Sequence, residues 1–254
     1  MSIYQGGKKR IGKRIYTVIL ELEKALNIDQ YNLEYFEPFC GMCSVLRHFS
    51  KADNRDVFAC DVNEDLILLL RAVQNNWKPP FECTKSEWEK LRDSNIHSAK
   101  RGFIGIAASW GGIFFQGYRL GYKTCRNYLK EAANGLDKLR DDIQNVLFMD
   151  SAVYDFFEPK NMLIYCDPPY KGNQLGKQNG FFRAFNHVQF WETMRKWCRN
   201  NIVIISESTA PSDFIKIWSA QSHVNNSNRY KTKKYEDNLY VHKLCYEKIP
   251  QSYI

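Results

Sequence analysis

A carboxylate, two prolines and an aromatic ring follow one another at Asp167, Pro168, Pro169 and Tyr170, directly after the apolar run 162–166. Proline lacks a backbone N–H and has a fixed φ, so a strand over 162–166 must end there. We expect a stiff loop at the carboxyl end of a buried strand, where open α/β sheets bind ligands. These groups suit a flat base that carries an amine. The alternative is an ordinary turn with a surface tyrosine.

A turn of small residues follows another predicted strand, at 33–36. Within it, Gly41 would let the backbone approach a ligand closely, and the helix that comes next would offer N–H donors. Asp61 ends the next predicted strand, 57–60, about 20 positions after Gly41. An acidic residue at that distance can accept hydrogen bonds from ribose hydroxyls. The alternative role for Asp61 is the N-cap of the following helix.

The other elements that would position these residues are predicted from periodicity. Apolar residues at helical spacing predict a helix through residue 26, and its first turns carry Lys8 and a cluster of further basic side chains. Positive charge at a helix N-terminus opposes the macrodipole, so we expect a negative partner nearby; the alternative is a solvated basic face. The remaining predictions are strands at 146–149 (ending at Asp150) and 202–207, a helix beginning at Pro211, and a closing antiparallel pair near 222–226 and 238–246.

Between the second and third predicted strands the character of the chain changes, which predicts an inserted region at 73–144. Residues 109–123 interleave glycine, aromatic and basic side chains. Rings can stack on bases or wedge between them, and Arg and Lys neutralise phosphate. The alternative is an aromatic mini-core with a basic rim. The residues that we expect to contact nucleic acid are Tyr118, Arg119, Lys123, Arg126 and Asn127.

Composition agrees with a globular chain that has a polyanionic partner. The chain has 254 residues, a net charge of +8 and a pI near 9.0. No apolar run approaches the roughly 20 residues of a membrane span, and the N-terminus lacks the apolar stretch of a signal peptide. Eight scattered cysteines indicate reduced thiols and an intracellular protein. Cys40 and Cys43 form a CxxC without a second pair, so no metal is expected.

The ordered set of motifs resembles the Dam-type, alpha-group adenine-specific DNA N6-methyltransferases, and most of all their small phage or viral members. The landmarks span nearly the whole chain in the family's order. Two positions depart from the family pattern: Tyr4 stands where Trp or Phe is common, and Cys43 ends the glycine turn. The landmarks are Tyr4-Gln5-Gly6-Gly7-Lys8, Phe36-Glu37-Pro38-Phe39-Cys40-Gly41, Asp61-Val62-Asn63 and Asp167-Pro168-Pro169-Tyr170.

This resemblance implies a Rossmann-like, S-adenosylmethionine-dependent methyltransferase sheet of the α/β class. The catalytic domain would comprise 1–72 and 145–254, and 73–144 would be a mainly helical target-recognition region. Lys8 would pair with the cofactor carboxylate, and Asp61 would bind its ribose. The implied cofactor-binding residues are Tyr4, Lys8, Phe39, Gly41, Asp61, Asp150 and Asp167.

The resemblance also implies a reaction: direct transfer of a methyl group to the N6 amine of an adenine flipped out of double-stranded DNA. Asp167, Pro168 and Tyr170 would be the catalytic residues. A restriction endonuclease is a possible partner, and the implied location is the cytoplasm of a prokaryotic or virus-infected host cell. Two alternatives stay open: the same fold acting on cytosine N4, RNA adenine or a protein glutamine, and a DNA-binding relative without catalytic activity.

Overall fold

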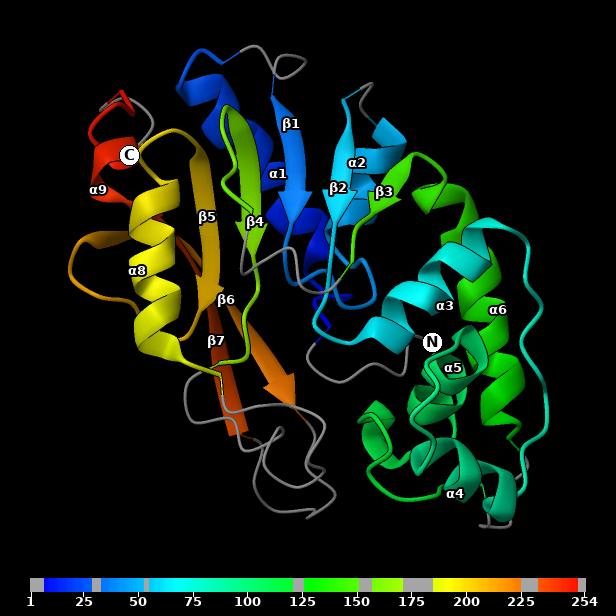
Figure 1. Cartoon of the computed structure of the whole chain (residues 1–254). Helices are drawn as coiled ribbons and strands as arrows, with labels where there is room; N and C mark the ends of the chain where they lie inside the picture. Colours follow the sequence, from blue (N-terminus) through cyan, green and yellow to red (C-terminus); the bar gives the residue numbers. More distant parts are fainter. Residues whose placement is uncertain are drawn as a thin grey trace.

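One mixed sheet organises the molecule (Figure 1). The computed structural model describes residues 7–28, 33–52, 55–120, 126–150, 157–170, 185–224 and 233–250. In these ranges seven strands lie in the order β3-β2-β1-β4-β5-β7-β6. The first five are parallel, and β7 runs antiparallel to β5 and β6. The strands are β1 (Glu34–Glu37), β2 (Val57–Ala59), β3 (Val146–Phe148), β4 (Met162–Cys166), β5 (Ile202–Glu207), β6 (Phe214–Val224) and β7 (Lys233–His242). The predicted Rossmann-like α/β class is confirmed.

Helices cover both faces of this sheet, because its central strands are apolar on both sides. In β4, Tyr165 packs on the face covered by α1, whereas Ile164 packs on the face covered by α8 (Figure 1). The helices are α1 (Gly12–Ala25), α2 (Leu46–Ala52), α3 (Glu64–Gln74), α4 (Lys85–Arg92), α5 (Ala99–Ala107), α6 (Tyr128–Arg140), α8 (His187–Trp197) and α9 (Lys243–Tyr246), with short 3-10 turns at η1 (Trp110–Gly112) and η2 (Asp141–Ile143).

The predicted insertion is helical where it is described, and α4, α5 and α6 lie beside α3 at one end of the sheet (Figure 1). Its buried side chains, Trp88, Phe103 and Leu136 among them, belong to the same hydrophobic cluster as Tyr35 of β1. The insertion therefore shares a core with the sheet, and it is fixed against α3 instead of being a separately packed unit.

The predicted helix after Pro211 is wrong, because the chain there forms β6 from Phe214 to Val224. Aromatic and β-branched residues suit a strand, and backbone pairing with β7 along its length decides the conformation. The predicted antiparallel pair is present, but its strands begin earlier than expected. Across the described part of the chain, no helix has the length and apolarity needed to span a membrane.

Candidate active site

Asp167 and Tyr170 lie at the carboxyl edge of the sheet, directly after β4, as predicted. Pairing of β4 with β1 and β5 on its two sides makes it a central strand, so the residues that follow it emerge between two neighbouring strand ends. Pro168 is buried and Pro169 is exposed. The Asp167 carboxylate is 17% exposed, so it is accessible and also largely desolvated.

Lys8 lies against this loop and is itself buried. Its Nζ donates to Asp167 Oδ1 at 2.7 Å, lies 3.4 Å from Asp237 Oδ1, and stands 4.4 Å from the centre of the Tyr170 ring. Burial opposes the ammonium form, but Asp167, Tyr170 and Asp237 outweigh it and raise the pKa of Lys8. Burial raises the pKa of Asp167 as well, and the Lys8 ammonium counteracts part of that rise. The two residues therefore form a partly buried ion pair at the end of β4.

Two residues that sequence reasoning missed hold the Tyr170 hydroxyl. Its oxygen lies 2.7 Å from Ser206 Oγ on β5, and it donates to Asp237 Oδ1 on β7 at 3.0 Å. Burial, followed by the nearby Asp167 carboxylate, raises the pKa of Tyr170, so the phenol keeps its proton. For Ser206 the available signal was the polar end of an apolar strand, Ile205-Ser206-Glu207, whereas Asp237 lay just before the strand predicted near 238–246.

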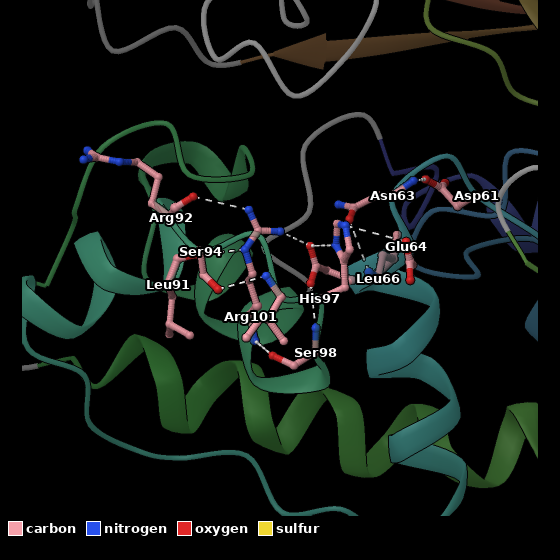
Figure 2. Close-up of polar contacts among 12 residues, drawn as sticks. Asp61, Asn63, Glu64, Leu66, Leu91, Arg92, Ser94, His97, Ser98 and Arg101 are labelled. Carbon is pink, nitrogen blue, oxygen red and sulfur yellow. Dashed lines mark hydrogen bonds and ion pairs between the residues drawn. The ribbon is translucent and has the colours of Figure 1, made fainter.

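The glycine turn and Asp61 meet at the ends of β1 and β2. Gly41 has a φ of +47°, and its N–H donates to Asp61 Oδ2 at 3.0 Å. Asp61 Oδ1 accepts from the Asn63 N–H at 3.0 Å (Figure 2). Burial raises the pKa of Asp61, and the two backbone donors oppose that rise. Asp61 thus ties the turn to the start of α3, and the N-cap is Asn63, whose side chain accepts from the Leu66 N–H.

Cys43 stands where the family pattern has a second glycine, and the backbone still makes the turn. The residue adopts a φ of +55°, in the region that glycine occupies most easily, and its N–H donates to the Cys40 carbonyl at 2.8 Å. Both cysteines are buried free thiols. No group of His, Cys, Asp and Glu in the described ranges could hold a metal ion.

Phe39 and Asp150, two of the remaining predicted cofactor residues, follow strands whose ends lie along the same edge. Phe39, in the turn after β1, packs edge-on against Phe185 and Phe190 at ring distances of 5.8 and 5.9 Å. Asp150 follows β3 and is highly exposed, with an oxygen 3.2 Å from an Arg71 nitrogen. Tyr4 lies outside the described residues.

The described residues among the predicted nucleic-acid contacts make hydrogen bonds and ring contacts within the insertion. Asn127 caps α6 by accepting from the Lys130 N–H, and the Tyr118 hydroxyl donates to the Cys83 carbonyl at 2.7 Å. Arg126 donates to Glu131 at 2.8 Å, and the Arg119 guanidinium lies 3.4 Å from the centre of the Tyr128 ring. Phe114 and Phe115 are buried, as in the alternative interpretation of an aromatic mini-core. Lys123 lies outside the described residues.

A buried carboxylate on α3 connects this insertion to the Asp61 segment. Asp65 is paired with Arg101 of α5, and both side chains are at most 3% exposed. Asp65 also accepts from the Ser98 N–H at 2.8 Å and contacts His97 Nδ1 at 3.0 Å. Figure 2 shows His97, Ser98 and Arg101 close to Asn63, the N-cap of α3. The insertion is therefore anchored one turn from the residues that follow β2.

Residues 4–100 match the sequence profile of the D12 class N6 adenine-specific DNA methyltransferase family. The predicted resemblance is confirmed. The matched range contains Lys8, the glycine turn and Asp61, whereas Asp167 to Tyr170 lie beyond it. The match supports methyltransferase activity, and methyltransferases generally use S-adenosylmethionine as the methyl donor. Comparison with curated protein sequences gives no match.

Solved structures similar to this chain include three methyltransferases. A proposed RNA methyltransferase from Pyrococcus horikoshii is 9% identical, with 90% of this chain and 83% of that chain covered and a TM-score of 0.41. TrmN from Thermus thermophilus is 13% identical, with coverage of 89% and 48% and a TM-score of 0.37. Precorrin-6y C5,15-methyltransferase from Geobacter metallireducens is 10% identical, with coverage of 89% and 84% and a TM-score of 0.34.

Proposed function

We propose that this protein is a site-specific DNA methyltransferase that transfers a methyl group from S-adenosylmethionine to the N6 amine of adenine. The observation that carries the proposal is the convergence of the Asp167–Tyr170 loop and Lys8 at the carboxyl edge of a sheet whose glycine turn is bonded to Asp61. The family match to residues 4–100 supports the reaction class and the adenine amine.

The residues present fit the cofactor. Each Asp61 carboxylate oxygen accepts one backbone N–H and retains a lone pair for a ribose hydroxyl. Gly41 brings the backbone close without a side chain in the way, and Lys8 offers an ammonium for a carboxylate. Phe39, Asp150 and Tyr4 complete the proposed set. When bound, S-adenosylmethionine supplies a methyl group on a positively charged sulfur.

Asp167, Pro168 and Tyr170 would receive the target base. The exocyclic nitrogen of adenine is a poor nucleophile because its lone pair is delocalised into the ring. An Asp167 carboxylate and a Pro168 carbonyl that accept its two hydrogens favour a pyramidal nitrogen, and Tyr170 stacks on the ring. Lys8 supports the role of Asp167 as an acceptor, because its ammonium donates to Asp167 Oδ1 and stabilises the carboxylate form. Flipping the base out costs on the order of a few kcal/mol, and alignment with electrostatics supplies most of the acceleration.

The insertion, 73–144, would contact the duplex, with 1–72 and 145–254 forming the catalytic domain. The proposed contacts are Tyr118, Arg119, Lys123, Arg126 and Asn127. The guanidinium groups of Arg119 and Arg126 both lie on the Tyr128 ring, at 3.4 and 5.1 Å from its centre, which supports a basic surface on α6. Anchoring of this region to α3 through Asp65 would keep that surface at a fixed position relative to the base site.

The test is Asp167→Ala, measured as methyl groups incorporated into DNA from labelled S-adenosylmethionine. Loss of one acceptor that acts on the reacting group should lower turnover by about 100- to 1,000-fold. The matched control is Asp93→Ala, which removes an exposed carboxylate paired with its neighbour Arg92 and should leave turnover unchanged. Circular dichroism and thermal denaturation establish that both variants are folded.

The product identifies the substrate. DNA from a methylation-free host that expresses the protein is digested to nucleosides and analysed by mass spectrometry, and N6-methyladenine is expected. N4-methylcytosine, methylated RNA, or unmodified nucleic acid from cells that contain folded protein would each contradict the proposal. A cofactor-dependent rise in melting temperature tests binding independently of turnover.

A further inference from the structure

The Tyr170 hydroxyl belongs to a directed chain of hydrogen bonds. Asp237 lies next to the Lys8 ammonium and is an acceptor, so the single phenolic proton of Tyr170 points to it at 3.0 Å. Ser206 must then donate to the Tyr170 oxygen at 2.7 Å. Ser206 is fully buried, and the Asp237 side chain is 13% exposed. Two partners from two different strands therefore fix the direction of the hydroxyl.

The strand registers explain why these groups meet. Side chains two residues apart share a face of a strand. Tyr165 of β4, Ile204 of β5 and Leu239 of β7 pack in the same cluster, on the side of α1. Moving two positions from each of these residues towards the carboxyl edge leads to Asp167, Ser206 and Asp237. In β7 this direction is towards lower residue numbers, because β7 is antiparallel to β5 and Glu207 is paired with Asn238.

We propose that Asp237, together with Ser206, is a positioning residue that sets the plane of the Tyr170 ring for the target base. The inference rests on the proposed function and goes beyond it, since β7 then contributes to base capture. The prolines fix the backbone ahead of Tyr170, but its side chain still has rotational freedom, and the hydroxyl chain removes that freedom. Asp237 also contacts Lys8 at 3.4 Å, so a role through charge must be separated from a role through the hydroxyl.

Asp237→Ala, Asp237→Asn and Tyr170→Phe separate the two roles in a single-turnover methylation assay. Asp237→Ala removes the acceptor, and Tyr170→Phe keeps the ring but removes its hydroxyl. Each should slow methylation by up to about tenfold, the effect of losing one ordinary hydrogen bond. The double variant should be no slower than either single variant, because both remove the same contact. Asp237→Asn keeps an acceptor oxygen and should retain most of the rate.

A readout that does not depend on methyl transfer is the fluorescence of 2-aminopurine placed at the adenine that the wild-type protein methylates. Stacking on Tyr170 should quench the flipped base in the wild-type complex. Asp237→Ala and Tyr170→Phe should show less quenching, whereas Asp237→Asn should behave as wild type. Cofactor-induced stabilisation should be unchanged in Tyr170→Phe.

The outcomes distinguish this inference from the proposed function. A wild-type protein that does not methylate DNA contradicts the proposed function itself. If the wild type is active, full activity and full quenching in Tyr170→Phe overturn the positioning role, even if Asp237→Ala does not fold. Equal losses in Asp237→Asn and Asp237→Ala, with additivity in the Tyr170→Phe background, would also overturn it, because they would show that Asp237 acts through its charge on Lys8.

Discussion

The Lys8–Asp167 pair determines the charge of the candidate site at the scale of single residues. Burial alone would favour a neutral lysine and a neutral carboxylic acid. At 2.7 Å each ion stabilises the other, so that Lys8 stays charged and the pKa of Asp167 rises less than burial alone would require. Each residue could be identified from its own motif. Their pairing spans 159 positions, and local sequence patterns carry no information on such a contact.

Lys8→Met should move the acid limb of the methylation rate to higher pH. In the proposed reaction Asp167 must be ionised, so activity falls as the pH drops through its pKa, which burial already holds above the ordinary value of 3.8. Removal of the Lys8 ammonium takes away the main opposing interaction, and the pKa of Asp167 rises further. The measurement is kcat against pH at saturating cofactor, since Lys8 is also a proposed cofactor contact.

Lys8→Arg is the matched control, because it keeps the positive charge and should leave the acid limb close to that of the wild type. An acid limb at the same pH in Lys8→Met and in the wild type would contradict the proposed role of the Asp167 carboxylate. Circular dichroism across the same pH range separates loss of catalysis from loss of the fold.

Secondary-structure elements were predicted as well as their local patterns allowed. The central strands are short apolar runs that end at Pro, Asp or small residues, and they were placed correctly. β7 (Lys233–His242) was predicted too far along the chain, at 238–246, because its first half is polar and Asp237 there lies before the predicted start. That half is a strand because it pairs with β6, a contact that sequence periodicity does not encode. The Asp237 contact to Tyr170 could not be predicted for the same reason.

Gly102→Ala should show how tightly α5 packs on α3. A Cβ at Gly102 would lie 2.2 Å from the Asp65 carbonyl oxygen, which belongs to backbone and cannot rotate away. The two helices would have to separate, and the buried Arg101–Asp65 pair lies at the same contact. We expect a loss of at least about 2 kcal/mol in the free energy of unfolding, measured by chemical denaturation.

Gly135→Ala provides the comparison within another helix of the same region. A Cβ at Gly135 meets nothing within 4 Å, so alanine should add about 0.5–1 kcal/mol through its higher helix propensity. Changes of the same sign in the two variants would show that intrinsic propensity, and not the packing of α5 against α3, dominates this region.

The whole molecule carries a net charge of +8. Two of its exposed lysines lie near opposite ends of α1. Lys13 is exposed near the start of α1, the end at which Lys8 reaches Asp167, whereas Lys24 is exposed in the last turn. The two residues are separated by about 16 Å along the helix axis. Only the first lies towards the carboxyl edge of the sheet, where the proposed base site is.

Lys13→Ala should therefore weaken DNA binding, and Lys24→Ala should not. A lysine that contacts one phosphate changes the slope of log K against log salt concentration by about 0.9, independently of DNA sequence. We expect that change for Lys13→Ala in fluorescence anisotropy titrations between low and moderate salt. Both substitutions lower the net charge of the protein by one, so an effect of total charge would be equal in the two variants. Equal slopes would contradict a duplex that runs along the edge that contains Asp167.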